Sequence, residues 1–133
     1  MTAPAEGPRT HVVAAVIQRD DRYLIGRRPL HKHHGGLWEF PGGKIAPGET
    51  AHAALARELR EELDLTVNHT GPSLHVDRDG ALFIEFLAAT VTGETKWLEH
   101  SALAWHTPAE LAALPLAPAD ARFVALLAGV SHD

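Results

Sequence analysis

Three glutamates carry the densest potential chemistry in this chain: Glu58, Glu61 and Glu62. Their spacing of i, i+3 and i+4 places the three carboxylates on one face of a helix. Like charges so close repel one another, and a hard divalent cation would offset that repulsion. Mg²⁺ binds through a few carboxylates, keeps several waters and accepts phosphate oxygens. The pattern therefore favours phosphoryl-type hydrolysis, in which a carboxylate orients or deprotonates water.

A solvated acidic helix face, with Arg57 and Arg60 as partners, is the commoner origin of a glutamate-rich helix. A longer pattern decides against it here, namely G-x5-E-x7-R-E-U-x-E-E-x-G-U, in which U is aliphatic. The matching residues are Gly43, Glu49, Arg57, Glu58, Leu59, Glu61, Glu62 and Leu65. At ordinary residue frequencies its six invariant positions coincide by chance on the order of 10⁻⁷ per start site.

The elements that must position these residues follow from periodicity and turn signals. A helix is expected over residues 50–63, because Leu55, Leu59 and Leu63 form one stripe and Thr50 is a suitable N-cap. Two β-branched runs, 12–17 and 23–25, are expected to form a hairpin around Asp20-Asp21. The other expected elements are strands at 37–40, 65–67, 73–77, 82–91 and 102–105, a turn at 79–80, and helices at 108–114 and 118–128. Trp97 and Trp105 are expected to be packing residues.

Composition restricts the class of protein. The chain has 133 residues, a net charge of −5 and no cysteine, which excludes disulfides, thiolate metal sites and a cysteine nucleophile. No apolar run approaches the roughly 18 residues of a membrane span, and residues 1–9 do not resemble a signal peptide. We expect a disordered lead at 1–9, a single domain at 10–130 and a cytoplasmic location. We expect no membrane partner, no nucleic-acid polymer, and a monomer or homodimer.

The long pattern resembles the signature of the Nudix hydrolase family. Asp64 stands where that signature has glycine. The glycine ends the helix in the left-handed region, which Asp tolerates better than most residues, so a small stability cost is expected. The resemblance implies an α/β fold in which a mixed β-sheet is sandwiched between α-helices (α/β/α).

The resemblance also implies roles for individual residues. It implies Mg²⁺ as cofactor, with Mn²⁺ able to substitute. The expected metal ligands are the Gly42 carbonyl, Glu61 and Glu62, with Glu58 as general base or a further ligand. Glu49 and Arg57 resemble the ion pair that braces the loop against the catalytic helix.

Flanking segments extend the likeness over roughly residues 11–128. Residues 37–45 resemble the MutT subgroup, which acts on nucleoside triphosphates, and Glu99 resembles an additional metal ligand. The expected substrate-binding residues are Arg28, His33, Phe40, Lys44 and Asp120. For three of these a simpler interpretation is also open. Arg28 could be a surface residue rather than a phosphate ligand. Phe40 could be a core residue rather than one that stacks on the base, and Asp120 could cap a helix rather than contact the base.

The leading hypothesis is Mg²⁺-dependent conversion of a modified or surplus nucleoside triphosphate to the monophosphate and pyrophosphate, for pool sanitation. The region 39–43 resembles MutT, which prefers 8-oxo-dGTP, whereas the segments around Glu99 and Asp120 resemble bacterial CTP pyrophosphohydrolases. MutT has Asn in place of Asp120, which leaves (d)CTP and 8-oxo-dGTP both open. The alternatives are a non-catalytic nucleotide sensor and a hydrolase of another nucleoside diphosphate derivative such as ADP-ribose.

Overall fold

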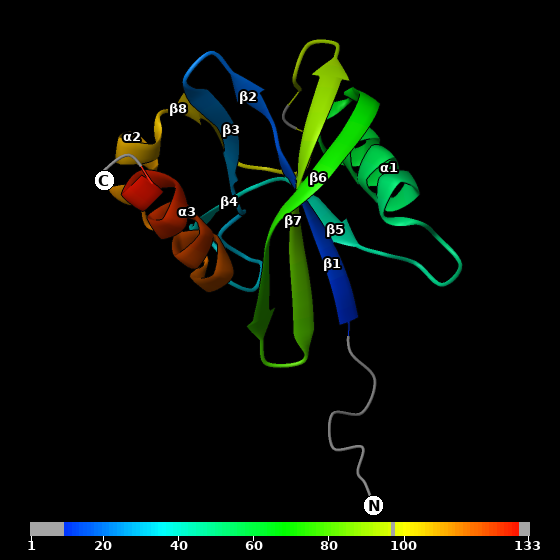
Figure 1. Ribbon diagram of the computed structural model, residues 1–133, viewed down its shortest axis with the longest axis horizontal. Coiled ribbons are helices and arrows are strands. Elements are labelled where there is room, and N and C mark those ends of the chain that lie inside the picture. The colour runs from blue at the N-terminus through cyan, green and yellow to red at the C-terminus, as the bar shows by residue number, and fades with distance from the viewer. Residues whose placement is uncertain (1–9, 97, 131–133) are drawn as a thin grey trace, which may run out of the picture.

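A computed structural model describes residues 10–96 and 98–130 of the chain, and Figure 1 shows their arrangement. The expectations for residues 1–9 and for Trp97 lie outside the described residues. The strands are β1 (Thr10–Val16), β2 (Gln18–Arg19), β3 (Arg22–Arg27), β4 (Trp38–Glu39), β5 (Gly42–Lys44), β6 (Thr66–Asp79), β7 (Leu82–Thr92) and β8 (Ala102–His106). The helices are α1 (Ala51–Leu63), α2 (Pro108–Ala112) and α3 (Pro118–Val130).

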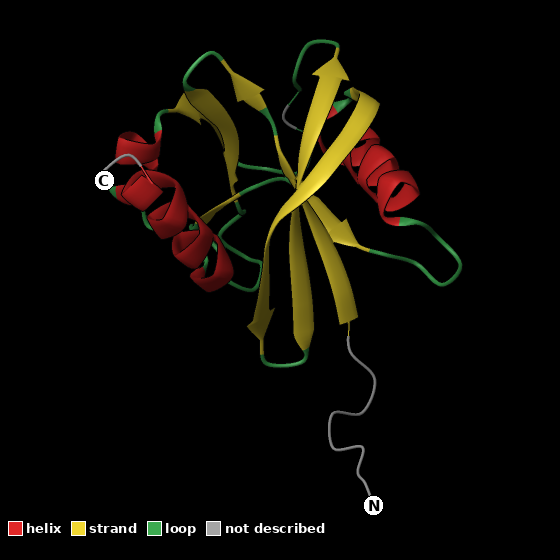
Figure 2. Ribbon diagram, in the orientation of Figure 1, coloured by secondary structure: helices red, strands yellow, loops and turns green. Residues whose placement is uncertain are grey.

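The strands form two sheets that lie between the helices. One sheet has the order β5-β1-β7-β6, and the other has the order β2-β3-β4 with β8 beside β3. Because β1 runs antiparallel to β5 and parallel to β7, the first sheet is mixed. Helix α1 lies on one side, and α2 and α3 lie on the other (Figures 1 and 2). The expected α/β/α arrangement is therefore confirmed.

The central strand β1 separates two cores because successive side chains of a strand point to opposite faces. Val13 and Ala15 pack with the leucine stripe of α1 on one face. Ala14 and Val16 pack on the other face with Phe86 of β7 and the first turns of α3. Both faces of β1 are consequently buried, which explains its continuous apolar sequence.

Helix α1 forms where the sequence pattern predicts it. The Thr50 hydroxyl accepts a hydrogen bond from the Ala53 N–H at 3.0 Å, which caps the first turn. Leu55, Leu59 and Leu63 have no exposed surface. Asp64 ends the helix at φ 58°, in the left-handed region, at the position where the signature it resembles has glycine.

Two sequence expectations need correction. The hairpin around Asp20-Asp21 joins only β2 to β3, whereas residues 12–16 pair with β5 and β7. The runs 65–67 and 73–77 are not separate strands, because β6 is one strand from Thr66 to Asp79 whose register shifts relative to β7 near Gly71-Pro72. Bulges accommodate the glycine and the proline without ending the strand.

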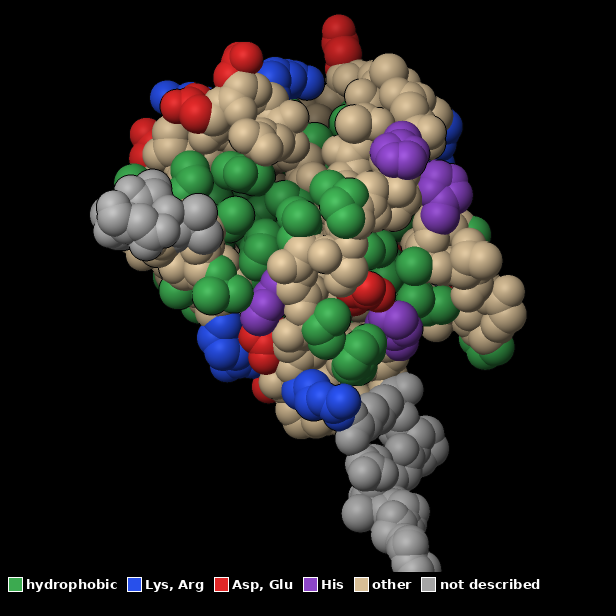
Figure 3. Space-filling view, in the orientation of Figure 1, with side chains coloured by type: hydrophobic (Ala, Val, Ile, Leu, Met, Phe, Trp, Pro, Cys, Tyr) green, Lys and Arg blue, Asp and Glu red, His purple; other side chains and the backbone are tan. Residues whose placement is uncertain are grey.

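The β6 side of the molecule carries exposed apolar side chains. Leu74 and Val76 on β6 and Leu126 on α3 are about half exposed, and Figure 3 shows hydrophobic side chains gathered on this face. The bulges of β6 disfavour pairing of this edge with another strand. In the described part of the chain, no helix combines the length and the apolar character needed to cross a bilayer.

Candidate active site

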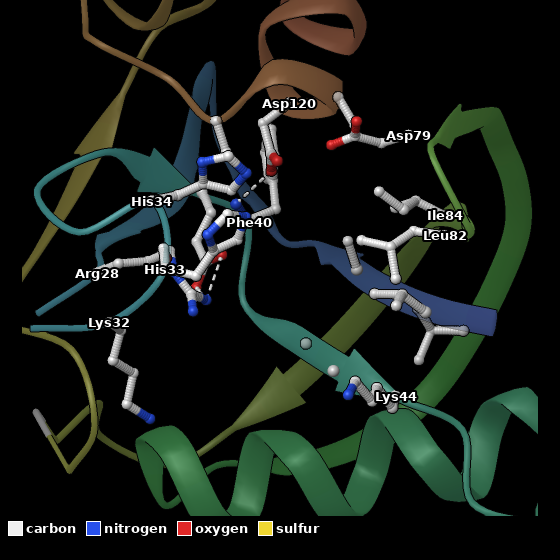
Figure 4. A pocket seen from close by; sticks show the side chains of 18 of the residues that line it. Arg28, Lys32, His33, His34, Phe40, Lys44, Asp79, Leu82, Ile84 and Asp120 are labelled. Atoms are coloured by element: carbon white, nitrogen blue, oxygen red, sulfur yellow. Dashed lines mark hydrogen bonds and ion pairs between the residues drawn. The ribbon is translucent and has the colours of Figure 1, made fainter. Parts of the chain in front are cut away.

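A cavity of about 450 Å³ opens between the two sheets, beside the C-terminal half of α1 and the first turn of α3. Its volume lies in the range typical of small-molecule sites. Figure 4 shows Asp120, His33 and His34 on one side, Lys44 near α1, and Leu82 and Ile84 on the opposite wall. Glu62 of α1 with Glu39 and Glu99 makes one end acidic, and apolar side chains of β7 line the other end together with Asp79 and Asp120.

The charged end of this cavity is acidic. Glu39, Glu62 and Glu99 all line it, and Glu62 is only 6% exposed. Burial raises the pKa of the Glu62 carboxyl to about 10, and the hydrogen-bonded Glu58 and the charges of Glu39 and Glu99 act in the same direction. With protein groups alone, the ionised form of Glu62 lacks a compensating positive charge.

A divalent cation would supply that charge, and the carboxylate oxygens of Glu39, Glu62 and Glu99 suit a hard one. Among the described residues, no three His, Asp or Glu side chains form a ready-made metal cage. Mg²⁺ does not require one, since it commonly takes one or two carboxylates, several waters and the phosphates of a substrate. The residues therefore fit a magnesium-type ion that is completed by substrate.

Two glycines allow β5 to lie close to both of its neighbours, helix α1 and strand β1. A Cβ added at Gly43 would lie 2.4 Å from Cδ of Glu58, so this carboxylate rests against the Gly43 backbone. A Cβ added at Gly42 would lie 2.0 Å from the Val13 carbonyl oxygen of β1. Larger residues would push β5 away from both β1 and α1.

An ion-pair network fixes the loop against the helix. Glu49 accepts hydrogen bonds from Arg57 at 2.8 and 2.9 Å, which is the bidentate geometry expected for this pair. Arg57 also donates to the Lys44 carbonyl and to Glu58, both at 3.0 Å. The Arg57 guanidinium lowers the pKa of Glu49 to about 2. Arg57 thus joins the loop, β5 and the acidic face of α1.

An acidic helix braced in this way beside a nucleotide-sized cavity matches one known family. The model of the NUDIX domain matches residues 7–127. The chain belongs to the Nudix hydrolase family. It is an enzyme that hydrolyses phosphorus anhydrides, and Nudix hydrolases generally use divalent metal ions.

Two relatives of this Nudix hydrolase are named for the nucleotide on which they act. The CTP pyrophosphohydrolase of Escherichia coli is 44% identical over 114 residues, which cover 82% of this chain and 84% of the relative. A Mycobacterium tuberculosis protein provisionally named 8-oxo-dGTP diphosphatase 2 is 41% identical over 122 residues, or 88% and 86% of the two chains.

Solved structures agree with this assignment. The solution structure of the E. coli ORF135 protein has a TM-score of 0.77 at 36% identity and covers 98% of this chain and 96% of its own. A MutT structure from a study of Aliivibrio salmonicida and Vibrio cholerae has a TM-score of 0.80 at 30% identity, with coverage of 92% and 98%.

The expected metal ligands of the Nudix hydrolase do not all line the cavity. Gly42, Glu62 and Glu99 line the cavity, and Glu58 lies just behind Gly43. Glu61 does not line it. The Glu61 side chain is 52% exposed and lies 3.5 Å from Arg57, so its role as a ligand stays a prediction.

Arg28 and His33 both line the cavity, but the Arg28 guanidinium is already engaged. It donates to both carboxylate oxygens of Glu39, at 3.1 and 3.2 Å, and to the His33 carbonyl at 2.7 Å. A single nitrogen, Nη1, therefore makes both contacts to Glu39, and the phosphate contact expected of Arg28 stays a prediction. The unpaired cations that line the cavity, among the described residues, are Lys44 and Lys32.

Phe40 and Asp120 are joined to each other. The Phe40 ring is 3% exposed and packs edge-to-face against Phe86 and Phe123, which favours the core interpretation over base stacking. Its backbone N–H donates to Oδ2 of Asp120 at 2.9 Å. Burial raises the pKa of Asp120 to about 8. Asp120 thus satisfies the Phe40 N–H and also lines the cavity.

Sequence reasoning missed three residues of the site: Lys32, Glu39 and His100. Lys32 and Glu39 lie in the loop and strand just before the glycines, and His100 follows Glu99 directly. Each of them lies close in sequence to residues that the motifs did indicate, and this proximity was the signal that could have identified them. Their importance depends on contacts between segments that are far apart in the chain.

Proposed function

We propose that this Nudix hydrolase converts a nucleoside triphosphate and water to the nucleoside monophosphate and pyrophosphate, with Mg²⁺ as cofactor and Mn²⁺ as substitute. The supporting observation is the polarity of the cavity, which has the carboxylates of Glu39, Glu62 and Glu99 at one end, with Glu62 buried, and apolar β7 side chains at the other. A triphosphate needs cations and carboxylates for its charged part, and a base needs an apolar slot with a few hydrogen-bonding groups.

At the charged end, Glu58, Glu62 and the Gly42 carbonyl would hold the ion, with Glu99 as a further ligand. The bound ion would neutralise phosphate charge and lower the pKa of a water molecule. A carboxylate of the α1 face, for which Glu58 is our choice, accepts the proton of the attacking water. Lys44 and Lys32 lie on opposite sides of the cavity in Figure 4 and would bind the outer phosphate oxygens.

At the other end, Asp120 would read the edge of the base. With a pKa near 8, its carboxyl is mostly protonated at neutral pH, so its free oxygen can donate a hydrogen bond. Such a donor suits an acceptor on the base, such as N3 of cytosine or O6 of guanine. The named relatives act on CTP and 8-oxo-dGTP, and we propose that (d)CTP or 8-oxo-dGTP is the substrate.

The test is a hydrolysis screen with Mg²⁺ over CTP, dCTP, dGTP and 8-oxo-dGTP, with identification of both products. We expect one nucleotide to be preferred and to yield pyrophosphate. Asp120→Ala should lower kcat/KM for that nucleotide by about 10- to 100-fold and affect poor substrates less, which flattens specificity. A uniform loss on all four nucleotides would show that Asp120 only supports Phe40. Release of inorganic phosphate instead of pyrophosphate would overturn the proposed reaction.

The lysine assignment has its own test. Lys44→Ala and Lys32→Ala should each raise KM for the preferred triphosphate and have a smaller effect on binding of the monophosphate product, because the lost contact is to the outer phosphates. Lys96→Ala is the matched control, since Lys96 pairs with Asp64 outside the cavity. We also propose that the enzyme acts as a monomer or homodimer on free nucleotides rather than on nucleic-acid polymers.

A further inference from the structure

His100 is a buried residue at the acidic end of the cavity. Its side chain is 3% exposed, and its ring lies over Gly26 of β3. A Cβ added at Gly26 would come within 2.6 Å of Cδ2 of His100, so only glycine leaves room for the ring there. Gly26 is also the residue that pairs with Glu39 across β3 and β4. The imidazole is therefore packed at a fixed place beside Glu39.

Backbone hydrogen bonds on both sides hold the segment that carries His100. The Leu98 N–H donates to the Glu62 carbonyl at 3.2 Å, which ties the segment to the end of α1. The Ser101 N–H donates to the Arg27 carbonyl at 2.9 Å, which ties it to β3. Residues 99 and 100 thus bridge the acidic helix and the second sheet.

One ring nitrogen of His100 faces two carboxylates. Nε2 lies 3.3 Å from Oε2 of Glu39 and 3.8 Å from Oε1 of Glu62. Nδ1 is buried and has no hydrogen-bond partner among the described residues. This environment fits the tautomer that carries its hydrogen on Nε2, because a hydrogen on Nδ1 would be a buried donor without an acceptor.

Glu39 connects His100 to the substrate side of the cavity. The same carboxylate accepts hydrogen bonds from Nη1 of Arg28, whose Nε donates to the carbonyl of His33. The chain of contacts therefore runs from the His33 loop through Arg28, Glu39 and His100 to Glu62. The link between His100 and Glu39 is within hydrogen-bonding distance, and the link from His100 to Glu62, at 3.8 Å, is a longer electrostatic contact.

We propose that His100 is a positioning residue for the metal end of the site. Its Nε2–H holds the Glu39 carboxylate and, through its approach to the adjacent Glu62, keeps Glu62 in the orientation in which that carboxylate receives a divalent cation. This inference rests on the proposed function in taking Glu62 as a metal ligand. Hydrogen-bonding partners of metal ligands typically contribute about 10- to 100-fold to metal affinity or activity.

Three substitutions separate a hydrogen-bonding role from a packing role. His100→Leu keeps an apolar side chain in the space but removes the donor. His100→Gln places an amide N–H near the position of Nε2, and His100→Asn carries the same amide one methylene shorter. His52→Leu is the matched control, because His52 is exposed on α1 and, among the described residues, its ring bonds Thr70 alone.

The first measurement is Mn²⁺ binding to the nucleotide-free protein, by calorimetry, with urea unfolding as the check on folding. We expect His100→Leu and His100→Asn to weaken Mn²⁺ binding by about 10- to 100-fold, and His100→Gln to recover most of it. The control should bind as the wild type does. In turnover assays kcat should fall in parallel, while KM for the nucleotide changes little.

Equal Mn²⁺ binding by the wild type and a folded His100→Leu or His100→Asn variant would overturn the proposal. Equal losses in all three variants would also overturn it, because they would show that only the shape of the imidazole matters. If His100→Leu fails to fold, the comparison of Gln with Asn still decides between the two roles. Because the measurement uses nucleotide-free protein, an error in the proposed substrate would leave this result intact. An absence of Mn²⁺ binding by the nucleotide-free wild type would overturn the proposal that His100 holds these carboxylates ready for the cation.

Discussion

Asp120→Asn has a consequence for stability that can be worked out directly from the structure. The carboxyl is buried, and Oδ2 accepts the Phe40 N–H at 2.9 Å. Burial foremost, and the charge of Glu39, raise the pKa of this carboxyl from 3.8 to about 8. Asparagine offers an oxygen to the same N–H, and it has no proton to lose.

The sign of the pH dependence follows from the raised pKa. The folded protein holds the Asp120 proton more tightly than the unfolded chain, so this contribution to stability is full below pH 3.8 and is lost as the pH rises to about 8. One pKa unit corresponds to about 1.4 kcal/mol, so the wild type should lose about 3 to 4 kcal/mol between pH 5 and pH 8 that the asparagine variant keeps.

The assay is urea unfolding of both proteins at pH 5, 6, 7 and 8 in the presence of EDTA. Other titrating groups are common to the two proteins, so they cancel in the difference between the two free energies of unfolding. The exposed Asp21→Asn variant controls for the substitution itself. A difference that stays constant from pH 5 to pH 8 would refute the reasoning, because the buried carboxyl would then not hold its proton.

Three further predictions concern the metal site and its helix. Excess EDTA should abolish turnover, and Mg²⁺ or Mn²⁺ should restore it; full activity in EDTA would remove the metal from the mechanism. Glu58→Gln and Glu62→Gln should each lower kcat by at least about 10²-fold while the fold survives, and wild-type turnover by both would exclude these carboxylates. Asp64→Gly should change the free energy of unfolding by no more than about 1 kcal/mol, because relief of the left-handed backbone offsets the exposed ion pairs with Lys96 and Arg60. A clear drop in Tm would show that these pairs matter more than their exposure indicates.

Helix α1 and its chemistry could be predicted from the sequence because they depend on local interactions. The Thr50 cap, the leucine stripe and the three glutamates are all determined by helical periodicity over a few turns. The Glu49–Arg57 brace could be predicted only through the family resemblance, since its residues are eight positions apart across a loop. The α/β/α arrangement came from the same resemblance and from the order of the elements.

The pairing of the strands was decided by the tertiary structure. Residues 12–16 precede the turn signal at Asp20-Asp21, and a hairpin with β3 was the local expectation, yet they pair with β5 and β7. Both faces of β1 are covered by core residues in that position, and a surface hairpin would leave one face exposed. The burial of apolar area over the whole domain therefore outweighed the local turn preference.

The sequence by itself determined the reaction class of this protein, because the carboxylates that serve it lie within one helix and the loop before it. Only the tertiary structure decided how the rest of the cavity is used. Arg28 meets Glu39, Phe40 enters the core and His100 reaches Glu62 through contacts that link separate segments of the chain. Such contacts depend on which segments pack together and on how much water they exclude, and helical or strand periodicity carries no information about either.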